Sequence, residues 1–174
     1  NIINLLAEIM GNEGCSGGIG GSMHLTDKKR GFVMSTAIVA NSIPIGVGLS
    51  MSQKYEYKKN ITLIFFGEGA TEQGVFYESI NFAALKNLPC LFICEDNLYS
   101  VYSNLKTRQP KRNILEILKK MGINGLSGDG NNPLKVFKYY QKAKKFINTN
   151  KKPFFLDLKT YRYLEHCGPF ADDH

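Results

Sequence analysis

The chain has 174 residues, of which 43% are hydrophobic and 21% charged, the composition of a globular domain with a hydrophobic core. No apolar run approaches the length of about 18 residues that a membrane span needs, so we expect no membrane partner. The net charge of +7 comes mostly from scattered lysines. It lacks the basic stripe with interleaved aromatics that is typical of nucleic-acid binding, so we expect no nucleic acid partner either.

Four cysteines are spread along the chain as Cys15, Cys90, Cys94 and Cys167, and none has the CxxC spacing of a redox or zinc motif. Cys90 and Cys94 fall in the apolar run CLFIC, which as a strand would bury both on one face. We therefore expect reduced thiols in a cytoplasmic protein.

The first ten residues, NIINLLAEIM, are typical of the inside of a helix, and FADDH ends the chain without a closing element, so we expect a fragment truncated at both ends. A glycine-rich loop follows at 11–24, and then a helix from about Ala37 to Tyr55. ITLIFF and PCLFICE are typical of strands buried on both faces. The further expected elements are helices at 75–88, 113–122 and 133–147 and a third strand at 153–163. This alternation predicts an α/β fold with a parallel sheet.

Polar side chains follow both of the first two predicted strands. Glu68 comes directly after ITLIFF, within GEGATEQG, and Asn97 follows CLFIC, within EDNLYS. One strand–helix–strand unit separates them, so both are expected at the same edge of the sheet, where open parallel sheets bind ligands. A carboxylate and an amide oxygen suit magnesium, which is held by carboxylates and by phosphate oxygens.

The glycines beside Glu68 serve a different need. Gly67 and Gly69 let the backbone approach a ligand closely, and the amides of Gly69 and Ala70 precede a helix start, which favours an anion. We therefore predict a magnesium ion and a diphosphate at this edge. Taken alone, Gly-Glu-Gly would be an ordinary turn. The literal GDG at 128–130 has no strong strand before it and no partner motif after it, and is expected to be a turn.

The stretch from GEGATEQG to EDNLYS resembles the thiamine diphosphate motif, which begins with Gly-Asp-Gly and ends with Asn-Asn. GGIGGSMHL, IVANSIPIGVGLS and DLKTYRY, in this order, resemble the alpha subunit of the 2-oxo acid dehydrogenases of the pyruvate, branched-chain and acetoin type. The resemblance implies one thiamine diphosphate-binding domain over residues 1–174, with a parallel sheet flanked by helices on both faces. It implies oxidative decarboxylation of a 2-oxo acid, with the acyl group passed to a lipoyl group. It also implies two partners, a beta subunit and a lipoyl-bearing acyltransferase, and usually a heterotetramer.

The resemblance also implies a ligand set for magnesium, formed by Glu68, Asn97 and the carbonyl of Tyr99. Two departures accompany it. Glu68 stands where the family has Asp, and the extra methylene disturbs the tight octahedral geometry of magnesium, so we expect weaker binding or a shifted backbone. Asp96 replaces the first Asn of the pair and adds a negative charge beside the site.

The remaining contacts that the resemblance implies are made with the organic cofactor. His166 falls where the family has a catalytic, diphosphate-contacting histidine, and Cys167 stands where mitochondrial members have a regulatory Ser, so phosphorylation control is not expected. The other implied contacts are those of the diphosphate with Gly67, Gly69 and Ala70, and of the aminopyrimidine with the backbone of Ala37 and Val39.

Other functions stay open at this point. The glutamate that activates the aminopyrimidine belongs to the beta subunit in this family, so we expect no turnover from this chain alone. One alternative is a non-catalytic alpha subunit retained for assembly, which Glu68 and Asp96 favour. A second is an acetoin- or sugar-pathway enzyme with the same cofactor, which the ending LEHCGP favours. A third is a dinucleotide-binding oxidoreductase, although Gly67, Gly69 and Gly74 lack the required glycine spacing.

Overall fold

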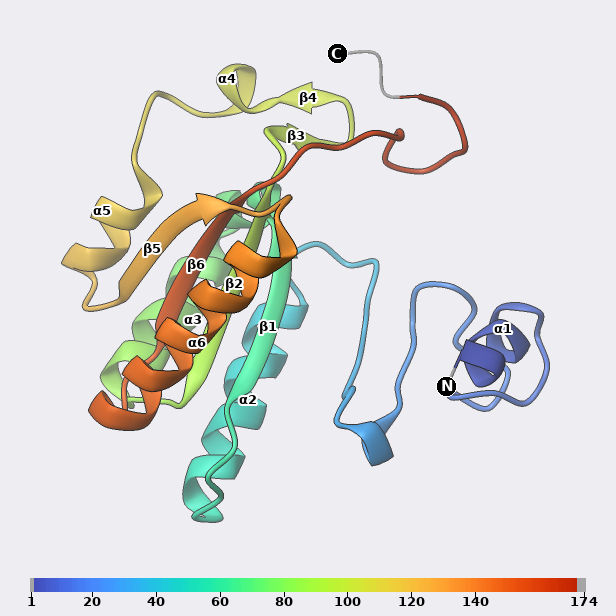
Figure 1. Cartoon of the computed structure of the whole chain (residues 1–174), viewed down its shortest axis with the longest axis horizontal. Coiled ribbons are helices and arrows are strands. Elements are labelled where there is room, and N and C mark those ends of the chain that lie inside the picture. Colours follow the sequence, from blue (N-terminus) through green and yellow to red (C-terminus); the bar gives the residue numbers. More distant parts are fainter. Residues whose placement is uncertain (1, 172–174) are drawn as a thin grey trace. The chain divides into compact units, whose positions relative to one another are not determined.

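The computed structural model of the protein describes residues 2–171, and Figure 1 shows the course of the chain. Contacts divide it into two compact units, an N-terminal unit of residues 1–42 and a C-terminal unit of residues 43–174. That both belong to one domain stays a prediction. Within residues 2–171, no helix is both long enough and apolar enough to cross a membrane.

The N-terminal unit is organised around a buried carboxylate. Its first helix, α1 (Ile2–Ile9), carries Glu8, which is buried and accepts hydrogen bonds from three backbone amides of the glycine-rich loop. The amides of Ser16 and Gly20 donate at 2.7 Å, and that of Gly18 at 3.0 Å. A short 3-10 helix, η1 (Lys28–Arg30), follows. The expected helical start and glycine loop are both confirmed.

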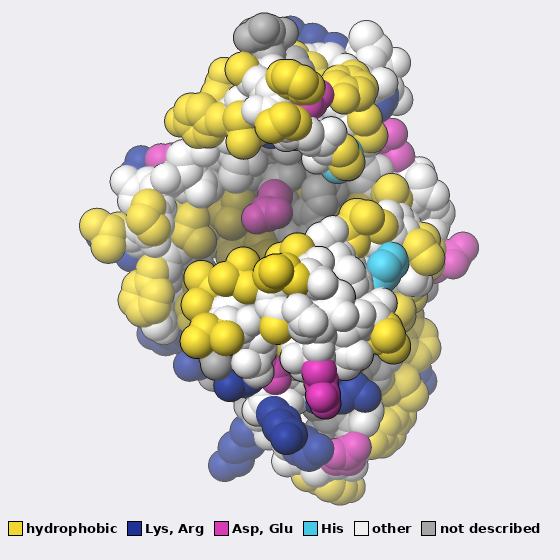
Figure 2. Space-filling view, turned by 90° about the vertical axis from the view of Figure 1, so that its right-hand side faces the viewer, with side chains coloured by type: hydrophobic (Ala, Val, Ile, Leu, Met, Phe, Trp, Pro, Cys, Tyr) yellow, Lys and Arg dark blue, Asp and Glu magenta, His cyan; other side chains and the backbone are white. Residues whose placement is uncertain are grey.

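Hydrophobic side chains gather in exposed patches on the surface, as the space-filling view illustrates (Figure 2). In the N-terminal unit they include residues of α1 and its end: Ile2, Ile3, Leu6, Ile9 and Met10. Contiguous apolar surface of this kind is typical of protein that packs against further protein.

The C-terminal unit is built on a four-stranded parallel sheet in the order β1-β2-β6-β5. The strands are β1 (Thr62–Gly67), β2 (Cys90–Asp96), β5 (Asn124–Asp129) and β6 (Phe154–Lys159). The helices are α2 (Ser42–Tyr55), η2 (Glu68–Glu72), α3 (Gly74–Leu85), α4 (Leu105–Arg108), α5 (Ile114–Lys120) and α6 (Pro133–Asn150). A small antiparallel hairpin, β3 (Tyr99–Ser100) and β4 (Ser103–Asn104), follows β2.

Helices lie on both faces of this sheet, with α6 on one side and α2 and α3 on the other (Figure 1). On the α3 side, the Phe76 ring packs edge-on against Phe66 of β1 and Phe155 of β6, with centroids 5.8 and 6.3 Å apart. On the α6 side, Ala143 and Ile147 pack against buried side chains of β2 and β6. The expected α/β fold with helices on both faces is thus confirmed.

Three details of the sequence prediction are wrong. β1 is buried on one face only, because it is an edge strand that α6 does not cover, and Leu63 and Phe65 are 43% and 54% exposed. The helix expected from Ala37 begins at Ser42, because Ala40 has a left-handed φ of 63° that no α-helix accommodates. The literal GDG, expected to be a turn without a strand before it, begins inside a strand, β5, which includes Gly128 and Asp129 and which its few apolar residues concealed.

All four cysteines are free, and Cys90 and Cys94 are buried on one face of β2 as expected. Burial raises the pKa of the Cys90 thiol to about 12 and that of Cys94 well above its ordinary value. Neither thiol is therefore a nucleophile at neutral pH.

Candidate functional site

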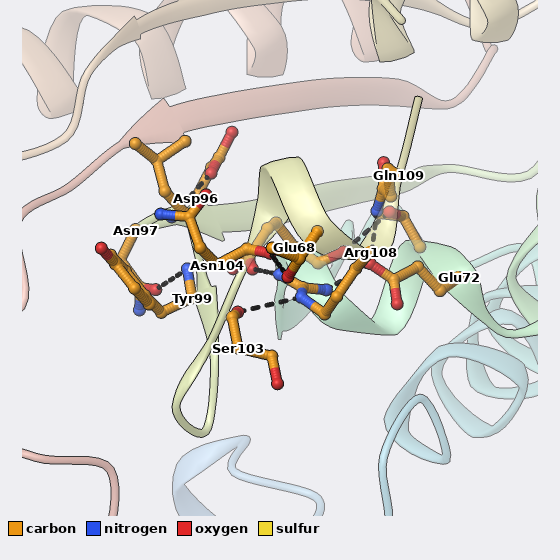
Figure 3. A network of polar contacts seen from close by, with 12 residues as sticks. Glu68, Glu72, Asp96, Asn97, Tyr99, Ser103, Asn104, Arg108 and Gln109 are labelled. Atoms are coloured by element: carbon orange, nitrogen blue, oxygen red, sulfur yellow. Dashed lines mark hydrogen bonds and ion pairs between the residues drawn. The ribbon is translucent and has the colours of Figure 1, made fainter. Parts of the chain in front are cut away.

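The carboxyl ends of the parallel strands bring four polar side chains to one edge of the sheet, and Figure 3 labels three of them, Glu68, Asp96 and Asn97. Glu68 follows the last residue of β1, Asp96 ends β2, and Lys159 ends β6. Asp96 and Lys159 are direct partners in the sheet register, and Asn97 comes next after Asp96. Since all three strands are parallel, these side chains are gathered by the fold itself, as the sequence predicted for Glu68 and Asn97.

Glu68 is buried, with only 5% of its surface exposed, and its carboxylate already has a cationic partner. Nη2 of Arg108, at the end of α4, lies 2.5 Å from Oε1 of Glu68. Burial raises the pKa of the Glu68 carboxyl, and this effect outweighs the lowering by Arg108. The charge at Glu68 is therefore costly, and the cationic Arg108 offsets part of that cost.

Arg108 is itself held from several sides. Its second terminal nitrogen pairs with Glu72 at the end of η2, and its Nε donates to the carbonyl of Ser103 at 3.0 Å. Gln109 also donates to Glu72, at 2.6 Å. Figure 3 shows the guanidinium between the two glutamates, so η2 and α4 are joined by one charged network.

The extra charge expected at Asp96 has a partner of its own. Nζ of Lys159 forms an ion pair with Oδ2 of Asp96 and lies 3.0 Å from Oδ2 of the buried Asp157. The other oxygen of Asp96 accepts from the amide of Leu98 at 3.1 Å. Burial alone would lower the pKa of Lys159, but its bonds to Asp96 and Asp157 raise it. Asp96 therefore does not leave an uncompensated charge beside Glu68.

Asn97 and Tyr99 form a tight turn beyond β2. Oδ1 of Asn97 accepts from the amide of Tyr99 at 2.9 Å, and Leu98 between them has a left-handed φ of 72°. This turn directs the chain into the β3–β4 hairpin and holds both predicted ligands at the edge that carries Glu68. Among residues 2–171, no cluster of three or more His, Cys, Asp or Glu side chains could hold a metal ion.

The donor set nevertheless fits a hard cation, because it consists of one carboxylate, one amide oxygen and one carbonyl. A carbonyl-type oxygen has two lone pairs, so the bond from Tyr99 leaves Oδ1 of Asn97 able to accept again. Glu68 is the member of the set that is occupied, since Arg108 already supplies its positive charge. These residues can hold a metal ion once Arg108 releases Glu68.

The two glycines that flank Glu68 differ in their surroundings. A Cβ added at Gly67 would meet nothing closer than the Glu95 carbonyl oxygen, at 4.0 Å, so the space before it is open. A Cβ added at Gly69 would lie 2.7 Å from Oγ of Ser100, in the hairpin. Gly69 is thus required by the protein's own packing, whereas Gly67 leaves room for a ligand. Gly69 and Ala70 lie within η2, ahead of α3.

The remaining predicted residues are not part of this network. His166 is exposed, in a segment after β6 that is anchored by a bond from Tyr102 to Glu165 at 3.2 Å. Ala37 and Val39 belong to the N-terminal unit, so their contacts with the cofactor stay a prediction. The literal GDG is not the expected turn, because Gly128 and Asp129 are the last two residues of β5 and pair with β6. Just beyond the strand, Oδ1 of Asp129 accepts from the amide of Asn131 at 3.0 Å.

Sequence reasoning missed both cations of the site. Arg108 lies 40 positions after Glu68, and Lys159 lies 63 positions after Asp96, so no local spacing links them. Lys159 also lines a cavity of about 290 Å³ behind Glu68, whereas Arg108 does not. The cavity lining includes Glu68, Asp96, Arg112, Asp157 and Lys159.

Comparison with known proteins identifies relatives of the whole chain. The model of the family "Dehydrogenase E1 component" matches residues 1–173. The pyruvate dehydrogenase E1 component subunit alpha of Rickettsia felis is 39% identical over 163 residues, covering 93% of this chain and 50% of the relative. The human somatic mitochondrial form of that subunit is 36% identical over 169 residues, and the match covers 95% of this chain and 42% of the human subunit.

The chain therefore spans about half the length of the curated relatives that it matches. Among solved structures, a transketolase mutant from Pichia stipitis superposes with a TM-score of 0.64 at 21% identity. That match covers 72% of this chain and 20% of the transketolase. It indicates a shared fold.

Proposed function

Since the chain belongs to the dehydrogenase E1 component family, we propose that it is part of an alpha subunit that decarboxylates a 2-oxo acid with thiamine diphosphate and magnesium. The observation that carries the proposal is the placement of Glu68 and Asn97 at the ends of adjacent parallel strands. The pyruvate dehydrogenase relatives favour a pyruvate-like substrate. An acetoin- or sugar-pathway substrate is the second candidate, whereas a dinucleotide-binding oxidoreductase does not fit this family.

In this proposal, the residues at the sheet edge hold the polar end of the cofactor. Glu68, Asn97 and the carbonyl of Tyr99 bind magnesium, and the amides of Gly69 and Ala70 bind the diphosphate. Gly67 leaves the space that such a ligand needs. When bound, thiamine diphosphate supplies the nucleophilic carbon and the electron sink, while the protein supplies binding and orientation.

Three more residues of this chain have proposed roles with the cofactor. The backbone of Ala37 and Val39 holds the aminopyrimidine ring, and the bulk of Val39 favours the bent form of the cofactor. His166 contacts the diphosphate from the segment that follows β6. The exposed position of His166 is compatible with this role, because a group that receives a ligand must be accessible in the free protein.

The proposal includes partners. A beta subunit completes the site, and a lipoyl-bearing acyltransferase accepts the acyl group, in a cytoplasmic complex. The exposed apolar residues of α1 support a partner, since such surface is normally covered by protein.

Turnover by the reconstituted subunits tests this function. The full-length chain and its beta partner are supplied with thiamine diphosphate, magnesium, an artificial electron acceptor and a panel of 2-oxo acids. We expect carbon dioxide release from at least one acid, abolished by chelation of magnesium. If the cofactor binds but no acid is consumed, a non-catalytic alpha subunit becomes the better account.

A further inference from the structure

Oε1 of Glu68 cannot pair with Arg108 and bind a metal ion at the same time. We infer that Arg108 is the resident counter-cation of Glu68, and that a divalent cation binds at this edge only when it displaces the guanidinium. This inference rests on the proposed function, because it takes Glu68 as a metal ligand. It makes Arg108 a positioning residue that sets how tightly the site binds a cation and which cation charge the site prefers.

The geometry of the Arg108 side chain carries the first step. Only 12% of the side chain is exposed, and each of its three nitrogens donates to a different protein oxygen, on Glu68, Glu72 and Ser103. A guanidinium held in this way is preorganised beside the carboxylate and does not drift into solvent. It therefore competes directly with any cation that approaches Oε1 of Glu68.

The charges around Arg108 carry the second step. A divalent ion brings one more positive charge to Glu68 than the guanidinium does, which offsets part of the cost of the exchange. Because the guanidinium is planar and rigid, its Nη2 leaves Glu68 only if the group turns, which can keep the bond to Glu72 or the bond to the Ser103 carbonyl but not both unchanged. The side chain can thus leave Glu68 without losing every partner.

The exchange has a structural consequence. Three contacts link residues 108–109 to η2: Arg108 with Glu68, Arg108 with Glu72, and Gln109 with Glu72. Release of Glu68 removes the first and leaves the bond between Gln109 and Glu72. Cation binding is therefore expected to loosen residues 105–109 without unfolding them.

Manganese titration tests the inference on the full-length chain with its beta partner, with Mn²⁺ in place of Mg²⁺ and free Mn²⁺ followed by electron paramagnetic resonance. Arg108→Met keeps most of the stem and removes the competitor. We expect it to bind Mn²⁺ roughly 3- to 30-fold more tightly than the wild type, the range between exposed and buried ion pairs. Arg112→Met is the matched control, because Arg112 lines the cavity behind Glu68 but bonds Gln109 and not Glu68. We expect it to leave the affinity unchanged.

Amide hydrogen exchange provides a readout that does not depend on affinity. In the wild type, Mn²⁺ should raise exchange at residues 105–109, and in Glu68→Ala it should not. Unchanged or weaker Mn²⁺ binding by Arg108→Met, with binding by the wild type intact and similar melting temperatures, would overturn the inference and leave the proposed function standing. Absence of Mn²⁺ binding by the wild type and by both arginine variants, also with thiamine diphosphate present, would overturn the proposed function itself.

Discussion

Lys159 and Asp96 are direct partners in the register of β6 and β2, and their side chains form an ion pair at the carboxyl edge of the sheet. Lys159 also bonds the buried Asp157, two residues earlier on its own strand. One partly exposed ammonium is therefore shared by two buried carboxylates. Glu68 and Asp96, the two acidic residues at which this chain departs from the thiamine diphosphate motif, are thus each paired with a cation, Arg108 and Lys159 respectively.

Replacing Lys159 with Met should destabilise the protein by about 1–2 kcal/mol, because Asp96 and Asp157 stay buried without their cation. The expected loss of stability is smaller than for a fully buried ion pair because the Lys159 side chain is 53% exposed. Urea unfolding of the full-length chain measures it. In Asp96→Asn the lysine serves Asp157 alone, so the double variant should lose less than the sum of the single variants. Strict additivity would contradict this coupling.

Replacing Gly69 with Ala should destabilise the protein by about 1–3 kcal/mol, because the new methyl group collides with Ser100. Gly67→Ala is the matched control. Its neighbours leave space and its φ of −80° suits any residue, so its effect should stay within about 0.5 kcal/mol. Thermal unfolding compares the two, and Ser100→Gly should rescue Gly69→Ala. Equal losses at both glycines would contradict the packing described here.

Replacing Glu8 with Gln should loosen the glycine-rich loop, because the amide group cannot accept all three backbone bonds and presents donors to donors. Amide exchange at residues 16–20 should rise in the variant, while exchange in the C-terminal unit should not change. Retained protection in the variant would show that the loop is ordered by other contacts.

The same carboxylate gives the loop a defined pH dependence. Burial alone would raise the pKa of Glu8, but the amides of Gly18, Gly20 and Ser16 lower it below its ordinary value of 4.5. A carboxyl whose pKa is lowered by folding stabilises the folded form above the unfolded pKa, and this stabilisation is lost as the pH falls through the folded value. Loop protection should therefore be constant from neutral pH to about pH 4.5 and fall below it. Loss of protection well above pH 5 would contradict this assignment.

Replacing Phe66 with Ala should cost about 3–5 kcal/mol, because its ring fills the core between Phe76 and Phe155. Phe65→Ala, one position earlier on the exposed face of β1, should cost far less. Denaturant unfolding compares the two. A larger loss at Phe65 than at Phe66 would contradict the assignment of Phe66 to the buried face of β1.

The parallel sheet, and the edge of it that carries Glu68 and Asn97, could be predicted from the sequence. The sheet follows from local runs of apolar residues, and the edge follows because the carboxyl ends of parallel strands lie together. The sequence is not sufficient for β5, whose residues NGLSGD form a strand only because they pair with β6. Nor does it predict the exposed face of β1, which depends on which strand lies at the edge. Arg108 and Lys159 could not be found because their partners are distant in sequence and are chosen by the fold.

Calorimetric titration of thiamine diphosphate into the full-length chain with its beta partner, with and without magnesium, tests the central claim most directly. Wild type should bind the cofactor only when magnesium is present, and Glu68→Ala should abolish that binding. Glu56→Ala, which removes an exposed carboxylate paired with Lys58, should bind like the wild type. Magnesium-dependent binding that survives in Glu68→Ala would contradict the placement of the metal at Glu68.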